Sequence, residues 1–344
     1  MSAVLASLFA SGFFSSEAVQ IALGVGVIVA IVAAPVGVLT VIRRQSFAGH
    51  AFGDIGTAGA SASFLVGLTP LWGLLLANLA GGAAMEGAGV ERARSRDIAT
   101  GIVLGAALSL AALFLYLDMT STSTTGQTVT ILFGSIFAIP TSTLPLAGGL
   151  GGVVLLVTLI FARPLLLSSV SPEIASAKGL PVRALSLLFL LTLGLAAALA
   201  AVTIGTILST ALLIGPAASA LRLTKRPLSA VLLSALIGIF AIVVGIVLAY
   251  DSYRWPPGDR TWPVSFFVVM LVFAAYLLSG VPDLVRRRRQ DSWSAAGGAR
   301  SGAGQRSTGD DRSTGGQRSG AGQRARGHEP HHRGGAGPLG EMEA

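Results

Sequence analysis

Residues 184–221 read ALSLLFLLTLGLAAALAAVTIGTILSTALLIGPAASAL and contain no charged side chain. A helix needs about 20 apolar residues to cross a bilayer, so this stretch is long enough for two crossings. Similar apolar runs recur from residue 18 to residue 280, and a soluble chain of 344 residues could not bury that many. Only 12% of the residues are charged, whereas an average soluble domain has about 25%. The sequence therefore predicts an all-α integral membrane protein.

Hydropathy and loop charge together predict about nine transmembrane helices. The expected spans are residues 18–42, 46–67, 71–88, 98–117, 143–162, 184–202, 204–221, 229–250 and 264–280. The segment TVTILFGSIFAIP (128–140) is too short to cross, so we expect a half-helix or re-entrant element packed against protein. Segment 202–223 is interrupted by Gly205, Gly215 and Pro216, which indicates a broken or closely packed helix.

Basic side chains predict the orientation in the membrane. The chain has 24 lysines and arginines. Most of those outside the C-terminal tail fall in loops at residues 43–44, 91–97, 163–183, 222–226 and 286–289. Loops rich in Lys and Arg stay in the cytoplasm, so we expect the N-terminus outside and the C-terminus in the cytoplasm. The net charge of +8 then reflects membrane orientation, and no nucleic-acid partner is expected.

The chain is expected to divide into three regions. Residues 1–17 form an extracytoplasmic N-terminal segment, and residues 18–289 form the transmembrane domain. Residues 290–344 are rich in Gly, Ser and Arg and repeat SGAGQR at 301–306 and 319–324. Because this composition offers little apolar surface to bury, we expect a disordered cytoplasmic tail.

The stretch SFAGHAFGDIGTAGAS (46–61) places His50 and Asp54 four residues apart in a region that otherwise avoids charge. At that helical spacing both side chains lie on one face. An imidazole and a carboxylate suit Zn²⁺, Mn²⁺ or Fe²⁺, and ionisable side chains inside a membrane mark ion pathways. We therefore predict a transient metal site at His50 and Asp54. The alternative is a mutually satisfied pair that only holds two helices together.

The residues around this pair are small. The small side chains are Gly49, Gly53, Gly56, Gly59, Ala60, Ser61 and Ser63, which allow close approach of a neighbouring helix. Two ligands do not hold a metal tightly, since a closed structural zinc site has four protein ligands. A transport site must release its ion, so an incomplete site is expected. We hypothesise that a second copy of the chain brings its own His50 and Asp54 to a shared axis.

The loop LLLSSVSPEIASAKGLPVRAL (165–185) predicts a short helix on the cytoplasmic surface. Ser171 suits the N-cap, Pro172 the first helical position and Glu173 the first turn. Gly179 suits the position just after the helix. The functional interpretation is a docking helix for a cytoplasmic partner, and the alternative is an ordinary interfacial helix between two spans.

Two features missing from the sequence limit the chemistry. The chain has no cysteine, so disulfides and thiolate metal ligands are excluded. Its only lysines, Lys178 and Lys225, are not preceded by glycine, so the chain has no P-loop for nucleotide binding. If transport is driven by ATP, the ATPase must be another polypeptide.

Five segments, in this order, resemble the membrane permease of bacterial ABC importers for zinc, manganese and iron. They are RRQSFAGHAFGDIGTAGASASFLVG (43–67), ILFGSIFAI (131–139), SPEIASAKGLPV (171–182), GTILSTALLIGPAASALRL (205–223) and WPPG (255–258). The resemblance covers residues 18–282. Relatives usually have the aspartate before the histidine, whereas His50 comes first here. Relatives often begin the later segment with Asp-Pro-Glu, where this chain has serine at residue 171.

The resemblance implies an all-helical permease that works by alternating access in a bacterial plasma membrane, surrounded by lipid. Its expected partners are two cytoplasmic ATPase subunits, an extracytoplasmic metal-binding protein and either a second copy of itself or a paired permease paralogue. The residues expected to couple it to the ATPase are Ser171, Pro172, Glu173, Ala177 and Gly179. No resident cofactor is expected, and the transported ion would be Zn²⁺ first and Mn²⁺ next.

Two other classes of function are alternatives to this one. A stand-alone secondary transporter or channel would use His50 and Asp54 as a proton relay and would need no ATPase. A membrane enzyme is poorly supported, because one histidine and few acids within the spans make no convincing catalytic set.

Overall fold

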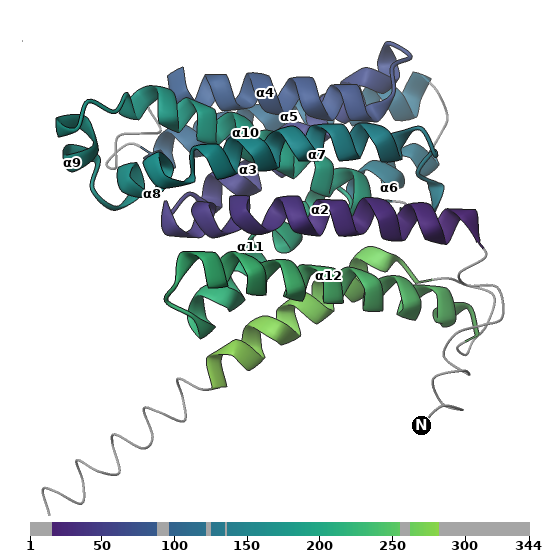
Figure 1. The fold of residues 1–344 in the computed structure, drawn as a ribbon. Coiled ribbons are helices and arrows are strands. Elements are labelled where there is room, and N and C mark those ends of the chain that lie inside the picture. The colour runs from purple at the N-terminus through teal and green to yellow at the C-terminus, as the bar shows by residue number, and fades with distance from the viewer. Residues whose placement is uncertain (1–15, 88–95, 122–124, 135, 255–261, 282–344) are drawn as a thin grey trace, which may run out of the picture. The chain divides into compact units, whose positions relative to one another are not determined.

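The computed structural model describes residues 16–87, 96–121, 125–134, 136–254 and 262–281. All regular structure within these residues is helical (Figure 1), which confirms the predicted all-α class for them. In chain order the elements are α2 (Glu17–Ile42), α3 (Ser46–Leu65), α4 (Pro70–Gly87), α5 (Arg96–Ser121), α6 (Thr125–Phe133), the 3₁₀ turn η1 (Ile136–Ala138), α7 (Thr143–Ile160), α8 (Ala162–Val170), α9 (Pro172–Ala177), α10 (Val182–Ile204), α11 (Thr206–Leu223), α12 (Pro227–Asp251), the 3₁₀ turn η2 (Ser252–Arg254) and a final helix, Val264–Val281.

Seven of the described helices are long and apolar enough to cross a membrane: α2, α5, α7, α10, α11, α12 and the final helix. The other two expected spans, α3 and α4, fall short in hydropathy, because α3 is rich in Gly, Ala and Ser and α4 carries Asn78 and Glu86. α3 packs against α4, α5, α10 and α11. Small residues suit a helix that meets other helices rather than lipid. The predicted number of nine therefore remains a prediction for α3 and α4.

Helices α2 and α10 form the centre of the bundle. In each helix, 72% of the most apolar stretch of 18 residues is buried inside the protein. α2 also packs against α7, α10, α11 and α12. The corresponding share in α5 is only 17%, and this helix exposes Ile102, Leu113 and Tyr116. A continuous apolar surface of this kind suits contact with lipid.

A single residue, Gly205, joins α10 to α11. Its φ of 86° and ψ of 162° lie in a region that only glycine adopts readily. On the far side of this link, Thr206 lies beside Thr57 of α3. One turn later, Thr210 lies beside His50, so α11 runs antiparallel to α3.

A second glycine, Gly134, packs against this link. It ends α6 with a φ of +74°, and a Cβ added to it would lie 2.5 Å from the backbone nitrogen of Gly205. The half-helix predicted within 128–140 is confirmed as α6 and η1. α6 packs against α3, α10 and α11, and η1 packs against α2 and α10. The break predicted within 202–223 is at Gly205, whereas α11 continues without interruption through Gly215 and Pro216.

The outer parts of the chain are only partly described. The chain divides into two units, Met1–Val285 and Arg286–Ala344. The expected tail (290–344), the motif WPPG (255–258) and all but the last two residues of the expected N-terminal segment lie outside the described residues. The region boundaries at residues 17 and 289, and the orientation across the membrane, stay predictions.

Gly205→Ala should destabilise the fold strongly. The alanine would be held at a positive φ, and its Cβ would collide with the backbone of Leu132 and Gly134, at a combined cost of about 2–6 kcal/mol. We expect the apparent melting temperature of the detergent-purified protein to fall by roughly 5 °C or more. The control is Gly105→Ala on α5, where a Cβ meets nothing within 4 Å. Equal melting temperatures for the two variants would show that the glycine link is not needed.

Candidate metal-binding site

His50 and Asp54 share one face of α3, as their spacing predicts. His50 Nε2 lies 3.9 Å from Asp54 Oδ2, which is too long for a hydrogen bond. The His50 side chain is 52% exposed and the Asp54 side chain 18% exposed. The imidazole is thus open, whereas the carboxylate beside it is mostly covered.

Helix α11 lies along the same face. Thr210 Oγ1 is 3.5 Å from Nδ1 of His50, at the outer limit of a hydrogen bond. Glycines of α3 permit this approach. A Cβ added to Gly53 would lie 2.7 Å from the carbonyl oxygen of Thr206, and one added to Gly49 would lie 3.2 Å from Ile214. The predicted close packing at these small residues is therefore confirmed.

The other two glycines of α3 face α4 instead of α11. A Cβ on Gly56 would lie 2.9 Å from Leu74, and one on Gly59 would collide with the backbone of Gly73. The stripe of small residues thus serves two helix interfaces, and only its first half adjoins the proposed ligands.

Two buried hydroxyls connect α3 to the places where the helical path is interrupted, at Gly134 and Gly205. Thr57, one turn beyond Gly53, donates from Oγ1 to Thr206 Oγ1 at 2.6 Å. Thr206 in turn donates to the carbonyl oxygen of Ile131 in α6 at 3.4 Å. Both threonines are almost completely buried. The helix that carries His50 is therefore held against the start of α11 and the end of α6.

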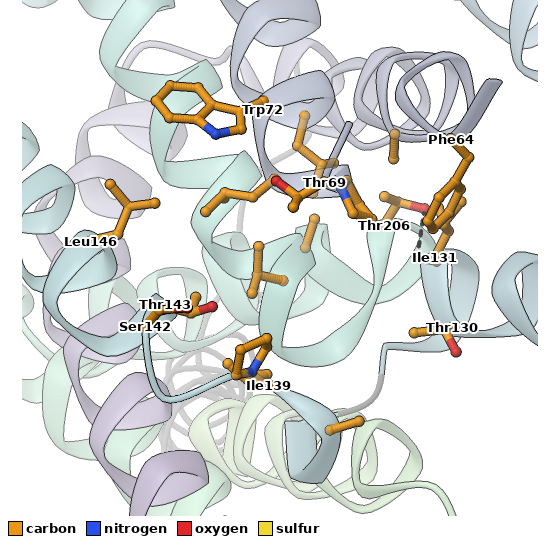
Figure 2. Close-up of a pocket in the computed structure, with 18 residues that line it drawn as sticks. Phe64, Thr69, Trp72, Thr130, Ile131, Ile139, Ser142, Thr143, Leu146 and Thr206 are labelled. Carbon is orange, nitrogen blue, oxygen red and sulfur yellow. Dashed lines mark hydrogen bonds between the residues drawn. The ribbon is translucent and has the colours of Figure 1, made fainter. Parts of the chain in front are cut away.

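A cavity of about 510 Å³ opens beside these hydroxyls (Figure 2). Its hydroxyl-bearing lining residues are Thr69, Thr130, Ser142, Thr143 and Thr206. Figure 2 shows Thr206 at the wall, hydrogen-bonded to Ile131, with the aromatic rings of Phe64 and Trp72 also turned to the cavity. None of the described residues lining it is charged, so the cavity has nothing comparable to the His50–Asp54 pair for a divalent cation.

This face of α3 carries one imidazole and one carboxylate. Within the residues that the structure describes, no group of three or more His, Cys, Asp or Glu side chains could hold a metal ion. One imidazole nitrogen and a carboxylate suit Mn²⁺, Zn²⁺ or Fe²⁺. The transient metal site at His50 and Asp54 stays a prediction.

The predicted surface helix is confirmed as α9. Ser171 occupies the N-cap position, Pro172 the first helical position and Glu173 the first turn. The serine hydroxyl forms no capping hydrogen bond with the described residues; its backbone carbonyl accepts the N–H of Ala175 at 3.0 Å. The proline and the backbone geometry, rather than the serine side chain, begin this helix.

Gly179 ends α9 as its sequence position predicts. Its φ is +76°, and its N–H bonds the carbonyl oxygen of Ser176 at 2.9 Å. The N–H of Leu180 bonds the carbonyl oxygen of Ala175 at 3.1 Å, and these two bonds together define a Schellman motif. Ala177 and the neighbouring Ile174 are exposed on the finished helix. Their exposure leaves this surface free to contact another protein.

Residues 15–277 match the ABC 3 transport family. The chain belongs to this family. It is 31% identical to the manganese import system permease protein ScaB of Streptococcus gordonii, over 77% of this chain and 94% of the relative. It is 28% identical to the high-affinity zinc uptake system membrane protein ZnuB of Haemophilus influenzae, over 68% and 90% respectively.

A solved structure supports the same assignment. PsaBC from Streptococcus pneumoniae, in complex with Fab, superposes with a TM-score of 0.67 and 27% sequence identity, covering 81% of this chain and 95% of that one. The chain is thus a metal-ion ABC importer permease, a multi-pass protein of the plasma membrane. It is a transport subunit and not an enzyme, and ATP hydrolysis belongs to a separate subunit.

Sequence reasoning missed the hydroxyls of α11 that face α3. Thr206, Ser209 and Thr210 follow one another at helical spacing, which was the available signal for a polar face. That signal does not say which neighbour the face meets. The single-residue link at Gly205 decides this, because it turns α11 back along α3.

The bond between Thr57 and Thr206 should appear as a coupling in a double-mutant cycle. Thr57→Val and Thr206→Val should each cost about 1–3 kcal/mol, because each leaves the other buried hydroxyl with fewer partners. The double variant should cost clearly less than the sum of the two. Thermal unfolding in detergent measures all three variants. The control pairs Thr57→Val with Ser219→Ala, whose hydroxyl bonds the carbonyl of Gly215 within its own helix. If the Thr57–Thr206 cycle is as additive as this control, the bond contributes nothing.

Proposed function

We propose that this chain forms the membrane path of an ATP-driven importer for a divalent transition metal, with His50 and Asp54 as the transient ion site. One observation carries the proposal: the imidazole is half exposed on a face of α3 where glycines bring α11 close. Placing ionisable groups within a membrane is costly, so such groups are retained for function. Family membership supplies the class of transport, and this face supplies its most suitable site.

The site becomes complete when two copies of the chain meet. A histidine and an aspartate from each copy would provide two nitrogens and two carboxylates, a set that holds a divalent ion and still allows release. The exposure of His50 supports this arrangement, because the ring is open to a group from outside the chain. The proposal is therefore a homodimer whose shared axis passes near α3.

The transported metal is proposed to be manganese ahead of zinc. The sequence alone favoured zinc, but the names of the relatives shift the order. ScaB, a manganese permease by name, is more similar to this chain than the zinc protein ZnuB, at 31% against 28% identity. Nitrogen and carboxylate oxygen ligands suit either ion, so both belong in the same experiment.

The partners are a cytoplasmic ATPase and an extracytoplasmic protein that delivers the ion. The ATPase would dock on α9, where Glu173, Ile174 and Ala177 are exposed. Alternating access would then carry the ion past His50 and Asp54. In this arrangement residues 1–17 lie outside, and residues 290–344 form a tail on the ATPase side.

ATP-dependent uptake of radiolabelled Mn²⁺ and Zn²⁺ tests the proposal. The chain is co-assembled with its candidate ATPase in vesicles, and wild type is compared with His50→Ala and Asp54→Ala. Loss of either ligand should lower uptake by at least about tenfold. The control is His328→Ala, a histidine of the C-terminal tail outside the described residues.

Two results of this experiment would overturn parts of the proposal. Uptake that ignores ATP would contradict the importer. Wild-type uptake by His50→Ala would mean that the imidazole is not a ligand. Equilibrium binding of Mn²⁺ to the purified protein tests the shared site, and one bound metal ion per chain, instead of one per two chains, would contradict it.

Ile174→Asp should weaken docking of the ATPase without disturbing the fold. Ile174 is 51% exposed on α9, so the change removes an apolar contact and adds a charge at the proposed interface. We expect the affinity for the ATPase to fall by about 30-fold, the effect of a strong interface residue. Ser176→Asp adds the same charge at another exposed position of α9 and is the control. Pull-down or light-scattering titration measures the affinity, and equal binding by both variants would place the interface elsewhere.

A further inference from the structure

Arg43, the C-cap residue that follows α2, reaches across to α8. Its Nη1 donates to Ser168 Oγ at 3.1 Å, to Ser169 Oγ at 3.2 Å and to the carbonyl oxygen of Leu165 at 3.4 Å. The two serine hydroxyls also donate to the same carbonyl of Leu165. One guanidinium thus meets three linked acceptors in the last turns of α8, directly before α9.

The same guanidinium also touches the helix that follows α9. Its carbon Cζ lies 4.8 Å from the centre of the Phe189 ring, a cation–π contact. Phe189 is a buried residue of α10. Arg43 therefore contacts both helices that flank α9.

α9 packs against both helices that flank it, α8 and α10. Ala175 of α9 is completely buried, and Leu165 of α8 and Leu185 of α10 are nearly so. The Schellman bonds at Gly179 lead directly from α9 into the start of α10. A displacement of α9 is therefore passed to the acceptors of Arg43, because a packed core transmits strain rather than absorbing it.

On its other side, Arg43 begins a tight turn into α3. The N–H of Arg44 bonds the carbonyl oxygen of Val41 at 3.1 Å, and that of Gln45 bonds the carbonyl oxygen of Thr40 at 2.9 Å. Arg44 has a φ of 56°, and Gln45 is buried as the N-cap of α3. This turn is stiff, and His50 follows after a little more than one turn of helix.

We propose that Arg43 is a positioning residue that couples the ATPase-docking segment to the metal-site helix. When α9 moves, the serines of α8 move Arg43, and the turn at residues 43–45 passes this movement to the start of α3 and so to His50. The inference rests on the proposed function. Arginine suits the task because its planar fork reaches several acceptors and stacks on a ring at once, which a lysine ammonium does not.

The test measures Mn²⁺ uptake and ATP hydrolysis together in vesicles that contain the full chain and its ATPase. In Arg43→Gln, hydrolysis should continue while the ions moved per ATP fall by about five- to a hundredfold, the usual range of coupling between two sites. Arg43→Lys should recover only part of this ratio. Arg44→Gln is the matched control, since Arg44 is the exposed neighbour in the same turn, and it should keep the wild-type ratio.

A second variant protects the test against simple misfolding. Ser168→Ala/Ser169→Ala leaves the arginine in place and removes two of its acceptors. It should lower the transport ratio in the same direction, and combining it with Arg43→Gln should add little. The inference is overturned if uptake and hydrolysis fall in proportion, or if only the melting temperature changes. Absence of ATP-driven uptake in the wild type would instead overturn the proposed function, and the coupling role with it.

Discussion

Two glycines packed against each other, Gly134 and Gly205, allow the chain to leave its helical path twice at one place inside the bundle. Helix breaks at membrane depth are tolerated only where protein surrounds them, and each break here is covered by the other. Because one residue alone links α10 and α11, α11 must turn back along α3. The opposition of Thr206 to Thr57 and of Thr210 to His50 follows from this link.

The same packing brings α11 close to α3 and still leaves the imidazole of His50 open. Glycines of α3 let α11 approach within contact distance, yet the imidazole of His50 stays half exposed. An aspartate at the centre of a membrane helix costs about 2.5–3.5 kcal/mol on the milder scales. Two ligands alone do not bind an ion tightly enough to offset this free-energy cost. The arrangement suits a site that is completed and emptied in each transport cycle.

The described structure also connects this site to the segment expected to receive the work of ATP hydrolysis. α9 is short, firmly capped by Gly179 and buried at Ala175, so it behaves as part of α8 and α10 rather than as a loose loop. Arg43 joins that body to the turn before α3 through charge-assisted hydrogen bonds, which are stronger than those between neutral groups. Few residues therefore separate the proposed docking surface from the proposed metal ligands.

The sequence by itself determined the features that depend on neighbours along the chain. Run length and composition predict membrane helices, a spacing of four places His50 and Asp54 on one face, and Pro172 with Gly179 marks the limits of α9, because helix periodicity and capping act within a few residues. The tertiary structure alone decided which helices meet: that Thr210 faces His50, and that Arg43 bonds α8 more than 120 positions away. It also decided that the low hydropathy of α3 belongs to a helix surrounded by other helices. Such contacts depend on the directions in which Gly134 and Gly205 turn the chain, and no local periodicity encodes those directions.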